Sequence, residues 1–130
     1  MVVVDTSVAL KWFFPEEGTD RAKALLGSVE MAAPDLLIYE FSNVLACRRQ
    51  QTGRDIARCL ETLYRFDIQF FFLPQNRFQR VLQLARQFDL SGYDASFVAL
   101  AEALNVDLVT ADAKLVQKTK SLSFVKLLSA

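Results

Sequence analysis

The chain alternates between short, continuous apolar runs and longer segments whose apolar residues recur every three or four positions. The first run, Val2-Val3-Val4, is β-branched throughout, which is typical of a strand buried on both faces. Helical spacing follows each run, and Gly or Pro residues mark most of the ends. We predict strands at residues 2–4, 31–33, 67–73, 107–109 and 123–127, and helices at 8–14, 16–26, 34–51, 54–65, 75–88, 91–104 and 112–118.

This order of elements predicts the fold class. Strands that alternate with helices favour crossover connections, a mostly parallel sheet and helices on both of its faces. A chain of 130 residues fits one domain and is long enough to bury its own core. We therefore expect an α/β protein, a three-layer α/β/α sandwich in a single domain that spans residues 1–130.

The composition limits the chemistry mainly through what is missing. The chain has no histidine, which excludes Ser-His-Asp and Cys-His nucleophiles and disfavours a zinc site. Cys47 and Cys59 fit no metal spacing, so we interpret them as small apolar residues in a reduced cytosol. No signal peptide opens the sequence and no apolar run reaches membrane length, so we expect a cytoplasmic location.

Two acidic residues follow predicted strands. Asp5 ends the strand at residues 2–4, and Asp112 comes shortly after the strand at residues 107–109. In an open parallel sheet the carboxyl ends of the strands line one edge, where ligands bind, so the two acids are expected to be neighbours. The alternative for each is the cap of the helix that follows it.

Two more acidic residues lie on apolar helix faces. Glu40 shares a stripe with Leu37 and Phe41, although glutamate usually occupies solvated faces. Asp94 stands in the first turn of a helix, where the alternative is a capping box with Ser91. An isolated buried glutamate would be neutral and destabilising, whereas one that faces a cation is neither.

Together, the four acids indicate a divalent cation bound by oxygen ligands. No histidine or lysine is obviously placed to pair with them, and carboxylates select Mg²⁺ or Mn²⁺. Such a cation suits phosphoryl chemistry, because it binds phosphate, lowers the pKa of a water and stabilises charge on a leaving oxygen. The fifteen basic and fifteen acidic residues cancel, so attraction to nucleic acid would depend on a local basic patch and on bound metal.

Four segments, in order, resemble the PIN-domain nucleases and, within them, the VapC-type toxins of toxin–antitoxin pairs. They are VVDTSVALKWF (3–13), EFSN (40–43), YDASFVALAE (93–102) and LVTAD (108–112). The resemblance implies an endoribonuclease that depends on Mg²⁺ or Mn²⁺, cleaves RNA, forms a homodimer and is silenced by an antitoxin protein.

The resemblance also assigns roles to individual residues. The acidic cluster of the family falls on Asp5, Glu40, Asp94 and Asp112, as both catalytic residues and metal ligands. Glu40 would either complete the metal shell or position the attacking water. The supporting positions are Thr6, Asn43 and Thr110.

Two surface features have more than one interpretation. Near the end of the Glu40 helix, Arg48 and Arg49 are candidates for contact with RNA, as is Lys11; Arg54 and Arg58 lie in the same region. The alternative for these cations is an ordinary solvated face. Two aromatic runs, residues 12–14 and 70–72, are either core or interface; we predict an interface for the Trp12 run and core for the second.

Two other functions compete with the nuclease. A PIN-like module that binds RNA or a protein without cutting is disfavoured, because such a module would be expected to have lost at least one of the four acids. A receiver-type phospho-acceptor domain also clusters acids at strand ends, but it needs a lysine at the end of a late strand. Lys126 lies inside its predicted strand instead.

Overall fold

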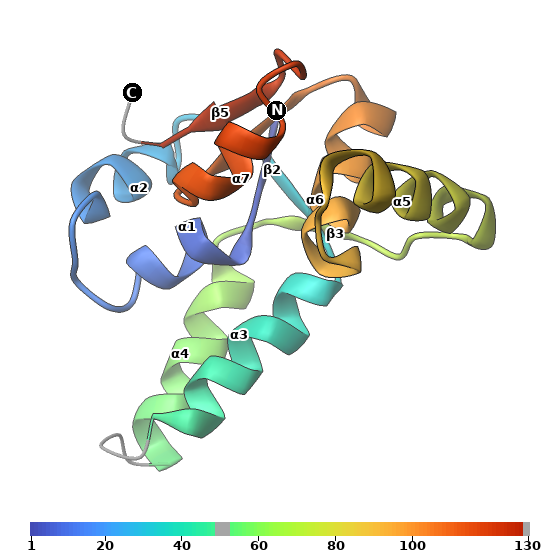
Figure 1. The fold of residues 1–130 in the computed structure, drawn as a ribbon. Helices are drawn as coiled ribbons and strands as arrows, with labels where there is room; N and C mark the ends of the chain where they lie inside the picture. The colour runs from blue at the N-terminus through green and yellow to red at the C-terminus, as the bar shows by residue number, and fades with distance from the viewer. Residues whose placement is uncertain (49–52, 129–130) are drawn as a thin grey trace.

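The computed structural model describes residues 1–48 and 53–128 and contains a five-stranded sheet flanked by helices (Figure 1). Its strands are β1 Val2–Val4, β2 Met31–Pro34, β3 Gln69–Phe71, β4 Asp107–Thr110 and β5 Val125–Leu127. Its helices are α1 Thr6–Lys11, α2 Thr19–Leu25, α3 Leu36–Cys47, α4 Gly53–Arg65, α5 Gln75–Phe88, α6 Gly92–Leu104 and α7 Ala113–Lys118. The predicted α/β class is confirmed.

The sheet is parallel at every junction and has the order β3-β2-β1-β4-β5. The first strand of the chain is therefore central, with Val2 beside both Met31 and Asp107. Val4 pairs with Val109, so β1 and β4 end at the same edge. The register thus brings the residues that follow these two strands together.

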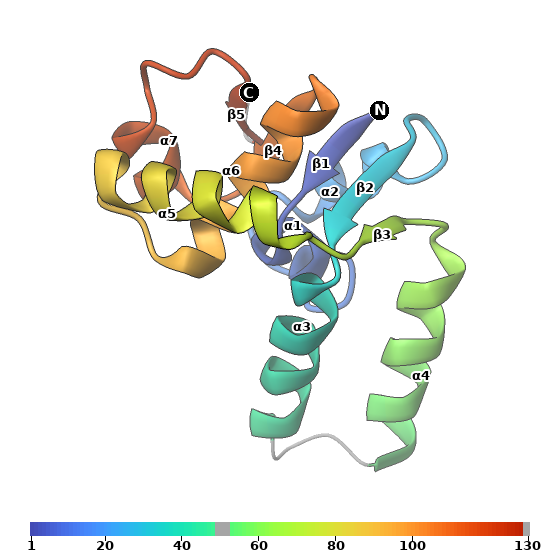
Figure 2. The same ribbon diagram turned by 90° about the vertical axis from the view of Figure 1, so that its right-hand side faces the viewer.

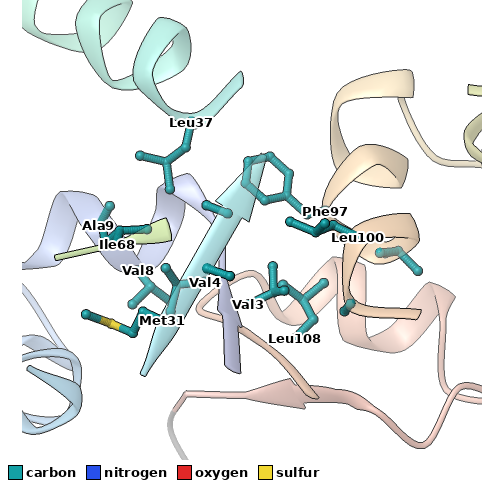
Figure 3. Close-up of a cluster of buried hydrophobic side chains, with 14 of the residues drawn as sticks. Val3, Val4, Val8, Ala9, Met31, Leu37, Ile68, Phe97, Leu100 and Leu108 are labelled. Carbon is teal, nitrogen blue, oxygen red and sulfur yellow. The ribbon is translucent and has the colours of Figure 1, made fainter. Parts of the chain in front are cut away.

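Burial on both faces of β1 agrees with its uninterrupted β-branched sequence. Val3 and Val4 point to opposite faces, and neither has exposed surface. Figure 3 shows them among Leu37, Phe97 and Leu108, which come from α3, α6 and β4. In Figure 1, α1 and α2 lie to the left of the sheet, and α5 and α6 lie to the right. The central strand is thus enclosed by helices, as the run of valines predicts.

The elements differ from the prediction mainly at their ends. The second helix begins at Thr19 rather than residue 16, after Gly18 in a left-handed conformation. The strand predicted at 67–73 is shortened to Gln69–Phe71, because Asp67 has a φ of 60° that an extended strand does not adopt. The described part of α3 ends at Cys47, and residues 49–51 of the predicted helix lie outside the described residues.

The prediction for the aromatic runs is wrong for Trp12 and for Phe72, whereas Phe70 and Phe71 pack against the core as predicted. Trp12 is only 7% exposed, and its indole N–H donates to the carbonyl of Ala22 at 2.8 Å. Phe72, by contrast, is 81% exposed. Trp12 belongs to the core because it follows α1 and packs against α2 and the ring of Phe66. Phe72 is exposed because it lies beyond the last paired residue of β3.

The helical hairpin α3–α4 projects away from the sheet (Figure 2). Among residues 1–48 and 53–128, no helix is both long enough and apolar enough to cross a membrane. Cys47 is on the surface, so of the two thiols only Cys59 packs against the core. Both cysteines are free thiols, and Cys59 is the one that packs as a small apolar residue.

Candidate active site

Asp5 is the most buried acid of the predicted cluster, with 7% of its surface exposed. It directly follows β1 and is the N-cap of α1, where its Oδ1 accepts from the Val8 N–H at 3.2 Å. The hydroxyl of Ser7 donates to Oδ1 at 2.5 Å, and the hydroxyl of Thr110 donates to Oδ2. Asp5 is therefore a helix cap and, at the same time, a carboxylate held by groups from two strand ends.

Glu40 is half-buried on α3, and α1 supplies its hydrogen-bond partner. The Thr6 hydroxyl donates to Oε1 of Glu40 at 2.6 Å, so the residue after Asp5 fixes this second carboxylate. Asn43, one turn further along α3, is exposed. Within the described part of the chain, Asn43 makes no hydrogen bond to Glu40. Of the two supporting residues predicted near Glu40, Thr6 is therefore the one that contacts it.

Asp94 differs from the other three acids because its carboxylate accepts no hydrogen bond from residues 1–48 or 53–128. It lies in the first turn of α6 and is half-buried. Its backbone N–H donates to the hydroxyl of the N-cap, Ser91, at 3.0 Å. The capping bond from Ser91 is therefore present, but the side chain of Asp94 remains available to a ligand.

Asp112 has one oxygen engaged in capping α7. Oδ1 accepts from the N–H groups of Lys114 and Leu115 at 3.0 and 3.2 Å. Oδ2 accepts no hydrogen bond from the described residues. As with Asp5, the predicted cap and the predicted ligand are the same residue, and the cap fixes where the second oxygen points.

Electrostatic repulsion connects the four acids through Asp94. Burial raises the pKa of Asp5 from 3.8 to about 6, against hydrogen bonds from Ser7, Thr110 and Val8, and the charge of Asp94 adds to the increase. Burial also raises the pKa of Glu40, and Asp94 again contributes. The pKa of Asp94 itself is raised by burial and by Asp112. A cation among these groups would relieve their repulsion and compensate for their burial.

The acids approach one another but do not form a preassembled ligand cage. Within residues 1–48 and 53–128, no group of three or more acidic or cysteine side chains is close enough together to hold an ion. The donors nevertheless fit Mg²⁺ or Mn²⁺, because they are all oxygens and Mg²⁺ usually takes only one or two carboxylates and keeps several waters.

The basic residues predicted near the site mostly have partners of their own. Lys11 donates to the carbonyl of Glu17 at 2.5 Å and forms a 3.2 Å ion pair with Glu16. The guanidinium of Arg48 lies 3.6 Å from the ring centroid of Phe14. Arg49 lies outside the described residues. Lys118 of α7 is the cation whose charge lowers the pKa of Asp94, although it also bonds the carbonyl of Asp89 at 2.8 Å.

Ser7 is a residue of the site that the sequence analysis did not single out. It contacts Asp5 and accepts a hydrogen bond from the Ala111 N–H at 3.0 Å. The available signal was a hydroxyl two positions after an acid at a strand end. Its second partner, 104 positions away, could not be found without the strand order.

The cluster predicts that the metal-free protein loses stability as the pH rises. The pKa of Asp5 is ordinary, near 3.8, in the unfolded chain and about 6 in the fold. Between these values the folded state binds more protons, so the free energy of unfolding decreases as pH rises, by about 3 kcal/mol for this group. The raised pKa values of Glu40 and Asp94 act in the same direction.

Urea unfolding in EDTA, at a series of pH values from 4 to 8, measures this effect against an Asp5→Asn reference. The stability of the wild type relative to the variant should fall across the range, and added Mg²⁺ should restore it at neutral pH. A difference that stays constant from pH 4 to 8 would show that Asp5 titrates normally.

Comparison with known proteins identifies the family to which this arrangement belongs. Residues 2–120 match the PIN domain. The chain belongs to the PIN domain family. The VapC ribonuclease Mb0985 of Mycobacterium bovis is 36% identical over 118 residues, 88% of each chain. Ribonuclease VapC3 of Pyrobaculum aerophilum is 34% identical over 129 residues, 93% of this chain and 96% of that protein.

Solved structures confirm the PIN fold. PAE2754 from Pyrobaculum aerophilum superposes with a TM-score of 0.68 at 25% identity, covering 98% of this chain and 89% of that one. VapC20 of Mycobacterium tuberculosis, described as a toxin that cleaves the sarcin-ricin loop, gives a TM-score of 0.73 at 14% identity, covering 96% and 97%. The family and fold expected from the four sequence segments are thus confirmed for this PIN domain.

Proposed function

We propose that this PIN domain is an endoribonuclease that depends on Mg²⁺ or Mn²⁺, acts in the cytoplasm and is the toxin of a toxin–antitoxin pair. The observation that carries the proposal is Asp94, half-buried at the start of α6 with no hydrogen bond from the described residues to its carboxylate. Its charge acts on Asp5 and Glu40, and that of Asp112 acts on it. Relatives named as VapC ribonucleases support the reaction class.

Asp5, Asp94 and Asp112 are the residues proposed to hold the cation. Asp5 is fixed by its hydroxyl donors, and Asp112 by the α7 cap that directs its second oxygen. Asp94 supplies a carboxylate that accepts no hydrogen bond from the described residues. A cation held by these residues would supply positive charge to stabilise the phosphate and the leaving oxygen during cleavage.

Glu40 is proposed either to complete the cation site or to position the attacking water. The Thr6 hydroxyl fixes one of its oxygens, so the other can face the cluster. Burial and the charge of Asp94 raise its pKa, which makes Glu40 a better proton acceptor than an exposed glutamate. A fixed carboxylate of increased basicity is suited to orient a water and to receive its proton.

The direct test is incubation of the purified protein with total cellular RNA in Mg²⁺, in Mn²⁺ and in EDTA. We expect discrete cleavage products with either ion and none in EDTA, because carboxylates alone do not neutralise the charge that develops on a phosphodiester. RNA that stays intact under all three conditions, while still binding the protein, would indicate the non-cutting module instead.

A second copy of this chain is the partner proposed for an exposed apolar patch beside the acids. The patch comprises Tyr39, Phe72, Phe78, Leu82 and Tyr93, each between 47% and 81% exposed. These residues line a groove of about 440 Å³ between the start of α3, the end of β3, and helices α5 and α6.

A toxin–antitoxin complex from Klebsiella pneumoniae shares the fold, with a TM-score of 0.70 at 19% identity, covering 89% of this chain and 90% of that one.

The area of the patch supports this occupant. Aromatic side chains present about 150–250 Å² each, so the patch exposes on the order of 500 Å² of apolar surface. A stable interface buries about 800 Å² on each partner, which the patch and its rim could supply in a symmetric pair. Tyr39 and Tyr93 directly precede Glu40 and Asp94, so two patch residues come from the same helices, α3 and α6, as two of the acids.

A further inference from the structure

Ser7 connects the two strand ends that carry Asp5 and Asp112. Its hydroxyl donates to Oδ1 of Asp5 at 2.5 Å, and it accepts from the backbone N–H of Ala111 at 3.0 Å. Ser7 is in the first turn of α1, whereas Ala111 follows β4. One half-buried hydroxyl therefore bridges segments that are 104 positions apart in the chain.

Counting protons fixes the direction of these bonds. A hydroxyl has one proton to donate, and an ionised carboxylate only accepts. Thr110 repeats the pattern, because it donates to Oδ2 of Asp5 and accepts from the Asp112 N–H at 3.0 Å. Both hydroxyl protons are thus committed to Asp5, and the 3.4 Å approach of the two hydroxyl oxygens is a contact between acceptors.

The two backbone N–H groups that donate to these hydroxyls belong to the segment that positions Asp112. The N–H of Ala111 bonds Ser7, and the N–H of Asp112 bonds Thr110. Ser7 and Thr110 therefore hold one oxygen each of Asp5 on one side and the backbone at Asp112 on the other. Together they set the separation between the two carboxylates.

We propose that Ser7 is a positioning residue for the divalent cation: it fixes the Asp5 carboxylate relative to Asp112 without touching the ion. This inference rests on the proposed function, because it requires a cation at the acidic cluster. Without the Ser7 hydroxyl, the Val8 N–H is the one donor that Oδ1 of Asp5 keeps among the described residues, and the Ala111 N–H loses its acceptor. Both carboxylates then become free to leave the separation that the ion needs.

The test measures Mn²⁺ affinity directly, by electron paramagnetic resonance of the free ion, in wild type, Ser7→Ala and Ser7→Thr. Loss of a group that orients a ligand typically weakens metal binding 10–100-fold, so we expect about that loss for Ser7→Ala. Ser7→Thr keeps the hydroxyl and should bind almost as wild type. Ser28→Ala is the matched control, because the described partners of the Ser28 hydroxyl are the carbonyls of Ala24 and Leu25, at the end of α2.

The outcomes separate this inference from the function on which it rests. If wild type binds Mn²⁺ and Ser7→Ala binds it equally well, the positioning role is wrong and the cation site stands. The same conclusion applies if Ser7→Ala also unfolds at a lower temperature in EDTA. In that case Ser7 would stabilise the fold by linking the ends of β1 and β4 and would have no role in cation binding. If wild type binds no Mn²⁺, the cation site itself is refuted. Should Ser7→Ala fail to fold, Ser7→Cys, a weaker donor of similar size, gives the same comparison.

Discussion

Replacing Asp94 by asparagine is expected to abolish metal-dependent RNA cleavage and to leave the fold intact. Asparagine has the same shape but no charge, so the cation loses the one carboxylate of the four that accepts no hydrogen bond from the described residues. Loss of a single charge-stabilising group in an active site commonly costs 10²–10³-fold in rate, and loss of a metal ligand should cost at least about that much. Cleavage of total RNA, followed over time with excess Mg²⁺, measures the loss.

The fold should survive because the capping bond of α6 involves the backbone of Asp94. The Asp94 N–H still donates to the Ser91 hydroxyl after the substitution. Removal of the charge also relieves its repulsion with Asp5, Glu40 and Asp112. The thermal midpoint of the metal-free variant should therefore equal or exceed that of the wild type.

Glu102→Gln is the matched control, a second loss of charge on the same helix. Glu102 pairs with Arg80 of α5 through two hydrogen bonds of 2.7 and 2.8 Å, away from the cluster. This variant should cleave RNA at the wild-type rate. An Asp94→Asn protein with the activity of Glu102→Gln would refute the assignment of the acidic cluster as the active site.

Introducing a charge into the apolar patch should convert a dimer to monomers. In Phe72→Glu or Leu82→Glu, association would have to bury an unpaired carboxylate, which costs several kcal/mol and corresponds to a Kd increase of at least about 100-fold. Light scattering coupled to gel filtration, at micromolar protein, distinguishes the two states. Both side chains are more than 60% exposed in the monomer, so circular dichroism and thermal midpoint should change little.

Tyr64→Glu provides the comparison, because Tyr64 is an exposed aromatic residue on α4 outside the patch. It should leave the dimer unchanged. A wild-type protein that remains monomeric at every concentration, or a Leu82→Glu variant that dimerises as well as Tyr64→Glu, would exclude the second copy as the occupant of this surface.

The sequence determined the class of the fold and the edge of the sheet at which chemistry is expected. Uninterrupted valines before Asp5 require burial on both faces, and alternating helices require parallel strands, so acids after β1 and β4 must emerge at one edge. The helical stripe on α3 placed Glu40 beside Leu37 and Phe41, both of which are fully buried in the structure. These conclusions depend only on local periodicity.

Only the tertiary structure decided which groups hold the acids and which surfaces stay open. One partner of Asp5 and the partner of Glu40 are hydroxyls 105 and 34 positions away, and periodicity carries no information about such pairs. It likewise cannot separate Trp12 from Phe72, since both lie in aromatic runs. A pattern shows which residues share a face, whereas burial depends on what packs against that face, and strand order and register determine that packing.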